Sequence, residues 1–415
     1  MRHVEDPDDR VATAPPASSA GNIGALLLIA NLGWAVPSVA GATLLQALVA
    51  DIDPARKIAF YGLLSTVGAA CASLGMIASG TLSDRTRSRF GQRKPWILGG
   101  GLIAAASLSA VGLFTYTPAI LTLYALYHLG QSAMHGALFA LVPDLVDRAR
   151  YGRVSGLAGL GLLLGQTLGG FAAASFLTLP AQGLVVLPWI TALVAILTVS
   201  KLPSSRPGVQ PSRPNPPPSI GAAFKLPKDA DFWRAFAGRF LFLLAFYLIL
   251  SYHLYVLTDY FHVAAEHTGR VFASLTLVFA VGAAVCVALS GSWSDRMGRR
   301  KPLVVGSSVL LAAAVLPPAL SDQLPSFYAF FGLAGLAFGT YLAVDQALMA
   351  DILPERANTA RDLAVLNVAN SLPHVLAPGI AGLIVTATGY AGIFVAASVA
   401  AVLSAIAVQA MKTID

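Results

Sequence analysis

The sequence is short of charged residues and has almost no cysteine. Charged residues make up 11% of the 415 positions, while 56% are hydrophobic. Soluble domains carry roughly one quarter charged residues, so water is not the main solvent of this chain. The two cysteines, Cys71 and Cys286, both fall inside apolar runs. A disulfide framework is therefore not expected, and we assign the thiols no chemistry.

The sequence also lacks the signatures of membrane enzymes and sensors. Histidine and carboxylate ligands at close helical spacing, as in H-E-x-x-H, are missing. We therefore predict no catalytic residue, no metal and no cofactor. The longest stretch without an apolar run, 201–231, is too poor in apolar residues to build a soluble signalling domain.

Long apolar runs fill most of the chain. About 20 helical residues cross a hydrocarbon core of about 30 Å, and runs of this length recur from residue 23 onward. An all-α membrane protein with twelve transmembrane helices follows from them. The predicted helices cover 23–48, 57–82, 96–116, 119–143, 154–177, 182–200, 233–258, 269–292, 303–320, 325–350, 363–386 and 389–410.

The net charge of +7 is explained by where the basic residues lie. Most of the 27 lysines and arginines fall in the segments on one side of the predicted helices. This is the positive-inside pattern, which predicts cytoplasmic termini in a multi-pass plasma-membrane protein and gives no indication of nucleic acid binding. The expected partners are a small-molecule substrate and the lipid bilayer, and we expect a monomer. A cleaved signal peptide is not expected, because the first twenty residues are acidic and contain proline.

The twelve helices divide into two sets of six. Residues 201–231 contain eight prolines and predict an extended linker. The sequence GTLSDRTRSRFGQRKP at 80–95 returns as GSWSDRMGRRKP at 291–302, and an offset of 207 pairs Asp144 with Asp351. We therefore predict two pseudo-symmetric six-helix bundles with a substrate site near the midplane between them. The expected boundaries are 1–22 (tail), 23–200 (first bundle), 201–231 (linker), 232–411 (second bundle) and 412–415 (tail).

The second copy of the repeat resembles the loop signature of the major facilitator superfamily, and the first copy is similar to its expanded form. The resemblance covers the whole chain and implies a secondary transporter that works by alternating access. Gly33-Trp34, the expanded loop and VDQALMADILP at 344–354 are similar to the branch that holds glycoside/cation symporters and plant sucrose transporters. The second predicted helix has no Asp or Glu, where the melibiose-type group places its sodium ligands, so protons are the expected coupling ion.

The repeated loops predict a gate on the cytoplasmic side. Their glycines permit a sharp turn, and their arginines can bridge carboxylates on neighbouring helix ends, with Asp144 and Asp351 as the expected acceptors. The alternative is that these basic residues only fix the orientation; the additional gating role is implied by the family resemblance. The gate residues are Asp84, Arg85, Arg93, Asp144, Asp295, Arg296, Arg299, Arg300 and Asp351.

Polar residues recur at helical spacing inside the apolar runs. The stripes are Asn31, Trp34 and Ser38; Tyr124, His128, Gln131 and His135; and Asn367, Asn370 and His374. Polar groups in hydrocarbon are costly unless they face protein or water, so the stripes predict a cavity. Amides that pair with hydroxyls and an indole that covers a C–H surface suit a polyhydroxylated solute. The alternative is helix packing through interhelical hydrogen bonds, worth about 0.6 kcal/mol each.

The complete set of predicted substrate-binding residues adds three residues to the stripes and does not include Ser38. Gln166 is placed opposite His374 by an offset of 208, Tyr247 lies in the seventh helix, and Gln346 follows Asp345 in the tenth. The residues are Asn31, Trp34, Tyr124, His128, Gln131, His135, Gln166, Tyr247, Gln346, Asn367, Asn370 and His374.

One carboxylate, Asp345, lies clearly within an apolar run. Arg239 of the seventh helix lies at a comparable depth, so the two can form an ion pair. We predict that proton arrival on Asp345 releases Arg239 and couples proton entry to transport. The alternative is a permanent pair that holds two helices together. His128 and His135 are second candidates for proton exchange.

Two functions remain open at this point. The first is a proton-coupled symporter of a sugar, glycoside or similar polar solute, which the polar stripes favour. The second is a proton-coupled efflux pump for drugs or secondary metabolites, because the same fold serves both directions. A mainly aromatic and aliphatic cavity, with Gln131, Asn367 and Asn370 engaged in helix contacts, would favour the second.

Overall fold

The computed structural model describes residues 18–88, 90–146, 150–202, 229–297, 299–351 and 359–412, and all regular structure in these ranges is helical. The first half comprises α1 (Ser18–Ile52), α2 (Lys57–Arg85), α3 (Lys94–Val111), α4 (Thr117–Leu145), α5 (Tyr151–Phe176), α6 (Pro180–Val186) and α7 (Trp189–Lys201). The second half comprises α9 (Ala230–Leu250), α10 (His253–Tyr255), η2 (Val256–Tyr260), α11 (Ala265–Met297), α12 (Lys301–Leu320), α13 (Leu324–Asp351), α14 (Thr359–Thr388) and α15 (Tyr390–Gln409).

Each of the twelve predicted runs coincides with helix, but two are broken. The sixth divides into α6 and α7 at Pro188, the N-cap residue of α7, which has no amide hydrogen to continue the helix. The seventh divides at Ser251 into α9, the short α10 and a π-helical turn, η2. Much of the predicted linker, residues 203–228, lies outside the described ranges.

In the described part of the chain, 11 helices are long and apolar enough to cross a membrane. The helix α4 is not among them, although its length is similar at 29 residues. Its central part carries the polar stripe Tyr124, His128, Gln131 and His135, which interrupts its apolar residues. The helix left out of this set is the one for which the sequence predicts the longest polar stripe.

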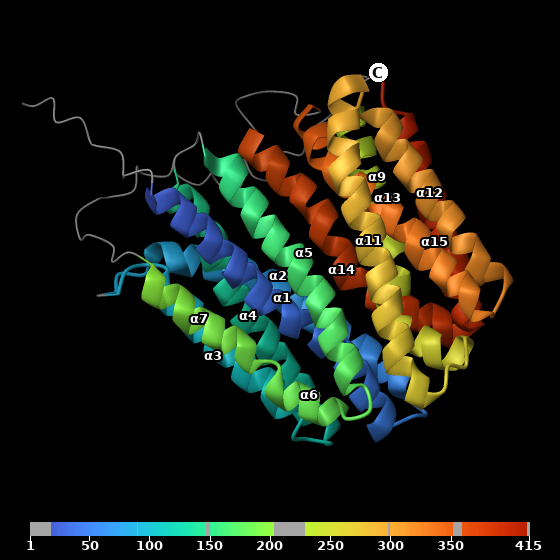
Figure 1. Cartoon of the computed structure of the whole chain (residues 1–415), viewed down its shortest axis with the longest axis horizontal. Helices are drawn as coiled ribbons and strands as arrows, with labels where there is room; N and C mark the ends of the chain where they lie inside the picture. Colours follow the sequence, from blue (N-terminus) through green and yellow to red (C-terminus); the bar gives the residue numbers. More distant parts are fainter. Residues whose placement is uncertain are drawn as a thin grey trace, which may run out of the picture.

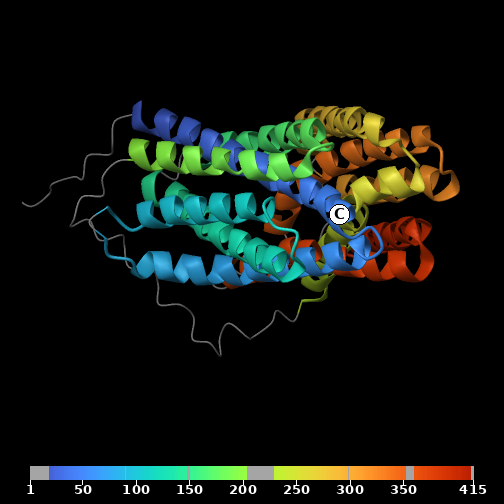
Figure 2. The same cartoon turned by 90° about the horizontal axis from the view of Figure 1, so that it is seen from below.

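The packing of the second half repeats that of the first. In the first half α1 packs on α5, α3 on α4 and α2 on α4; in the second, α9 packs on α14, α12 on α13 and α11 on α13. The two halves meet along two seams, where α2 packs on α14 and α5 packs on α11. Because α11 is the counterpart of α2 and α14 that of α5, the two seams are equivalent. This is the arrangement expected for a duplicated six-helix unit (Figures 1 and 2).

Each seam places a glycine of one half against a threonine of the other. A Cβ on Gly170 of α5 would lie 2.6 Å from Thr276 Cγ2 of α11, and one on Gly379 of α14 would lie 2.9 Å from Thr66 Oγ1 of α2. Small residues of this kind allow helix backbones to approach closely without a large side chain between them. The two seams are therefore alike in local packing as well as in topology.

Within the first half, glycines of α5 bring its backbone against α1. A Cβ on Gly161 would overlap the backbone of Leu28, and one on Gly165 would lie 2.6 Å from Ala35 Cβ. The residues recur every four positions, so they share one face of α5. This contact requires glycine because any side chain would push the two helices apart.

The bundle has two ends, which we call the terminal face and the distal face. The terminal face holds Arg93, Lys201 and Lys301; the distal face holds Lys57 and Asp259. In Figure 1 the distal ends of the two halves lie together at the lower right, while α1 begins at the left and the C-terminus lies at the top. The halves thus converge at the distal face.

Candidate functional site

A buried ion pair joins α9 to α13 inside the second half. Arg239 Nη2 lies 3.0 Å from Asp345 Oδ2, and each side chain is 3% exposed. The pairing predicted from the sequence is therefore present. Arg239 Nε and Asp345 Oδ1 are also buried, and neither has a hydrogen-bond partner among the described residues. The buried Tyr341 hydroxyl interacts with Asp345 but forms no hydrogen bond of normal geometry, so the carboxylate is incompletely satisfied, which is unusual for a buried charged group.

The polar stripes of α1 and α4 face each other. The rings of Trp34 and His135 have their centroids 4.4 Å apart, and Gln131 Nε2 donates to Ser38 Oγ at 3.2 Å. Gln131 Oε1 is buried and accepts no hydrogen bond from a described residue. The two stripes therefore form one polar surface that still has a free acceptor.

Asn31 is already engaged within α1. Its Nδ2 donates to the Leu27 carbonyl at 2.8 Å, and its Oδ1 accepts from Trp34 Nε1 at 3.1 Å. Both polar ends of the amide thus have partners in the same helix. This arrangement agrees with the packing alternative for Asn31 and leaves Trp34 held in a fixed orientation.

Tyr124 and His128 pack deeply against α2. Their rings meet edge to face with centroids 4.6 Å apart, and Tyr124 is 5% exposed. A Cβ on Gly68 of α2 would lie 2.5 Å from His128 Cδ2, so the imidazole fills the space that this glycine leaves. Of the α4 stripe, Gln131 and His135 are thus the members that contact α1.

In the second half, Tyr247 of α9 and His374 of α14 lie together with ring centroids 3.6 Å apart. Asn370, one turn before His374, is exposed, as is Gln166 of α5, and neither forms a hydrogen bond with a described residue. The side chains of Gln346 and Asn367 lie outside the described set. The structure therefore brings only part of the predicted set into contact.

A charged cluster around Arg93 braces the terminal face of the first half. Arg93 lies 2.7 Å from Asp84 through Nη1 and 2.8 Å from Asp144 through Nε. Burial acts to lower the pKa of Arg93, but the hydrogen bonds and charges of Asp144 and Asp84 outweigh it and raise the pKa. The cluster joins the ends of α2, α3 and α4, as the predicted bridge to Asp144 requires, and its gating role stays a prediction.

The remaining predicted gate residues are less clearly placed. Arg85 is exposed, and Arg300 occupies the position equivalent to Arg93 and has interactions of its own. Arg299 is exposed and lines a pocket described below. The side chains of Asp295, Arg296 and Asp351 lie outside the described set.

The distal face holds a charged contact between the halves that sequence reasoning missed. Lys57 Nζ of α2 lies 2.7 Å from Asp259 Oδ2 of η2, and the Tyr390 hydroxyl donates to the same oxygen at 2.7 Å. Lys57 Nζ also lies 5.0 Å from the centre of the Tyr255 ring. The available signal was a cation, Lys57, and a carboxylate, Asp259, at the outer ends of two predicted helices.

Tyrosine and glutamine hydrogen bonds extend this distal closure. The Gln46 side chain of α1 donates through Nε2 to the Ser251 carbonyl at 3.1 Å, and the Gln46 backbone carbonyl accepts from the Tyr255 hydroxyl at 2.7 Å. The Tyr252 hydroxyl donates to the Ile58 carbonyl of α2 at 3.1 Å. These bonds run from one half to the other, so they hold the two halves together at the distal face.

Replacing Lys57 with methionine should loosen the distal closure. The pair is partly exposed, at 18% for Lys57 and 26% for Asp259, so its loss is worth about 1 kcal/mol, or about a fivefold population shift. The labelling rate of a cysteine at Ser251, in a background without Cys71 and Cys286, measures the shift. The control is Arg56→Met, which removes a neighbouring charge that forms no ion pair with a described residue. Equal rates in both variants would show that the pair does not hold this face closed.

Comparison with known proteins agrees with this architecture. The sequence profile described as Major Facilitator Superfamily matches residues 23–277 and 254–413. A search of curated proteins found no match. Among solved structures, a bacterial homologue of the human lysosomal transporter Spinster, in an inward-facing and occupied conformation, has 16% identity and a TM-score of 0.70, over 95% of this chain and 96% of that one.

A second solved structure, a variant of the nucleoside transporter NupG, has 14% identity and a TM-score of 0.75, over 94% of this chain and 99% of that one. At these identities the likeness concerns the fold. The fold agrees with the sequence profile, which matches both six-helix halves. The chain belongs to the Major Facilitator Superfamily and is a membrane transporter.

Proposed function

We propose that the protein is a proton-coupled symporter that imports a sugar, glycoside or similar polar solute across the plasma membrane by alternating access. The observation that carries the proposal is the buried Arg239–Asp345 pair between α9 and α13. The terminal face is cytoplasmic in this proposal, because basic residues such as Arg93, Lys94 and Lys301 flank the helices there.

The ion pair offers a place for the coupling proton. Asp345 uses Oδ2 to bind Arg239, while Oδ1 is buried without a hydrogen bond from a described residue. A proton on Oδ1 neutralises the carboxylate and leaves the guanidinium without its counter-charge. A buried, unpaired charge is costly, so protonation favours a rearrangement of α9 against α13. The proton and the movement of the helices are thereby linked.

The polar surface between α1 and α4 supports a hydroxylated solute. Gln131 presents a buried acceptor without a partner among the described residues, and Trp34 of α1 contacts His135, one turn along α4. In the second half, Tyr247 and His374 supply a second aromatic surface. Hydroxyls pair with amides while rings cover the C–H face of a sugar. The resemblance of VDQALMADILP to glycoside symporters points to the same class.

Export of lipophilic drugs is the second candidate. It is favoured by the engagement of Asn31 within α1 and by the Gln131–Ser38 bond, both of which serve helix packing. If these amides are purely structural, the remaining surface is mainly aromatic. The two candidates therefore differ in the chemistry of the ligand that stabilises the protein.

A thermal-shift screen of the purified full chain tests the proposal. Sugars, glycosides, nucleosides and lipophilic cations are compared, because a ligand at 100 times its Kd stabilises the native state by about 2.7 kcal/mol. We expect a polar glycoside to raise Tm and Gln131→Leu to remove that shift. The matched control is Gln323→Leu, an exposed glutamine in the loop before α13. Stabilisation by lipophilic cations alone would reject the polar solute and favour export.

A further inference from the structure

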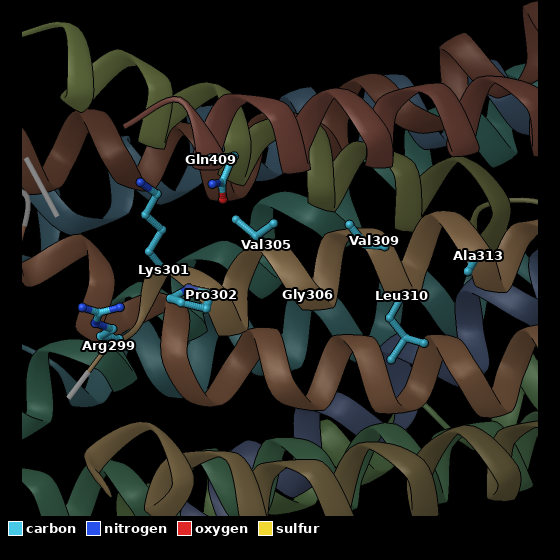
Figure 3. A pocket seen from close by; sticks show the side chains of 9 residues that line it. All are labelled: Arg299, Lys301, Pro302, Val305, Gly306, Val309, Leu310, Ala313 and Gln409. Carbon is cyan, nitrogen blue, oxygen red and sulfur yellow. The ribbon is translucent and has the colours of Figure 1, made fainter. Parts of the chain in front are cut away.

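A pocket opens on the outer surface of the second half, between α12 and the end of α15. Its volume is about 920 Å³. Arg299, Lys301 and Gln409 line one end, and apolar residues of α12 line the rest as far as Ala313 (Figure 3). One end of the pocket is thus cationic and the remainder is apolar.

The apolar part follows the membrane-facing side of α12. Pro302, Gly306, Val309 and Ala313 are exposed and are spaced 4, 3 and 4 apart, which places them on one side of the helix. The opposite side is buried, where Ser308 Oγ lies 3.0 Å from Ser404 Oγ of α15. This surface therefore lies at acyl-chain depth and faces away from the helix bundle.

The length of the pocket corresponds to one leaflet. From Lys301 to Ala313 the helix rises roughly 18 Å at about 1.5 Å per residue. Half of a hydrocarbon core of about 30 Å is about 15 Å. The cations at the terminal face therefore lie at headgroup level, and Ala313 lies near the middle of the bilayer.

The two cations are held differently. Lys301 Nζ donates to the Met411 carbonyl at 2.7 Å, which fixes the ammonium beside the pocket. Arg299 is exposed and its guanidinium has no hydrogen bond or ion pair with a described residue. Its five N–H donors match the geometry of a phosphate group.

The first half lacks the arginine of this pair. The repeat offset of 207 places Gln92 opposite Arg299, Lys94 opposite Lys301 and Gly99 opposite Gly306. The lysine keeps its local role, because Lys94 Nζ donates to the Leu202 carbonyl at 2.8 Å. The cation at Arg299 is therefore specific to the second half, because the first copy of the repeated loop folds with Gln92 at this position.

We propose that this pocket binds an anionic phospholipid of the leaflet at the terminal face. The phosphate lies at Arg299 and Lys301, and one acyl chain lies along Gly306 and Val309. Basic pockets between transmembrane helices suit anionic headgroups, and each cation near the membrane surface contributes about 1 kcal/mol. The site is separate from the Arg239–Asp345 pair and does not depend on the identity of the solute.

Lipid titration of the purified full chain, read by native mass spectrometry, tests the site. We expect phosphatidylglycerol to bind in preference to phosphatidylcholine. Arg299→Gln, which copies Gln92 of the first half, should weaken phosphatidylglycerol binding about fivefold, at 1.4 kcal/mol per tenfold, and leave phosphatidylcholine unchanged. Gly306→Leu should weaken both lipids by filling the acyl-chain path. Lys301 is not changed, because its loss would also remove the bond to Met411.

The matched control is Gly99→Leu, which should leave lipid binding unchanged. A Cβ at Gly306 or at Gly99 meets no atom within 4 Å, so both variants should fold alike. Unchanged phosphatidylglycerol binding in Arg299→Gln and Gly306→Leu would overturn the proposal. Full competition by soluble glycerol phosphate would also overturn it, since a chainless anion would then suffice. A change of oligomeric state in Gly306→Leu without loss of lipid would show that the surface binds a second copy of the chain instead.

Discussion

Asp345→Asn should abolish proton-driven accumulation of solute while solute exchange continues. Asparagine keeps the shape of the side chain but cannot take up and release a proton at this position. The inside-to-outside ratio in proteoliposomes with an imposed pH gradient should therefore fall to about 1, the value for equilibration without coupling. Counterflow of labelled solute, measured in the same vesicles, reports whether the substrate site still cycles.

If the ion pair is purely structural, removing both charges should leave accumulation intact. A variant with both residues changed therefore separates the structural role from the coupling role. Asp345→Asn alone leaves Arg239 buried without its counter-charge, which costs about 3–5 kcal/mol of stability. Arg239→Gln with Asp345→Asn removes both charges and should restore much of the Tm. If the double variant accumulates solute as well as the wild type does, the pair only holds α9 and α13 together, and the coupling role is rejected.

Gly161→Val should destabilise the first half severely. The new Cβ would overlap the backbone of Leu28, and neither helix can move aside without opening the α1–α5 contact. We expect a loss of about 3 kcal/mol, the upper end of the usual range for overpacking, because the new atoms overlap backbone that cannot rotate away. Thermal unfolding followed by size-exclusion chromatography of the fluorescently tagged protein measures the loss.

Gly159→Val provides the matched control for this substitution. It lies two residues away on α5 and brings the same change in helix propensity, but its Cβ meets no atom within 4 Å. Its Tm should stay within a few degrees of the wild type. Similar Tm values for the two variants would show that the close approach of α5 to α1 contributes little to stability.

Some contacts were predictable because a charge inside hydrocarbon has few possible partners. Arg239 and Asp345 lie at similar depths, so their pairing follows from depth. Asp144 is predicted as an acceptor for a different reason, because it ends the fourth helix beside the basic loop that holds Arg93. The distal bonds of Tyr252 and Tyr255 go to backbone carbonyls, which every residue carries, so no sequence pattern marks them. The superfamily was recognised from the repeated loop because that signature occurs twice at matching positions.

The phase of a polar stripe predicts which side of a helix it occupies but not which helix it meets. Asn31, Trp34 and Ser38 share one side of α1, yet their spacing contains nothing about α4. The meeting of Trp34 with His135 and of Ser38 with Gln131 is set by tertiary packing. The same reason explains why the seam glycines Gly170 and Gly379 were not singled out.

The likeness of the two seams has a mechanical consequence. Two rigid bodies that touch at two equivalent points can rotate about the line through those points. Each six-helix half can then turn without a change in its own fold. In the alternating access proposed above, the Gly170–Thr276 and Gly379–Thr66 contacts would act as these two points. The two bundles then reorient without unfolding. A bulky side chain introduced at one of the two contacts would block the rotation at both.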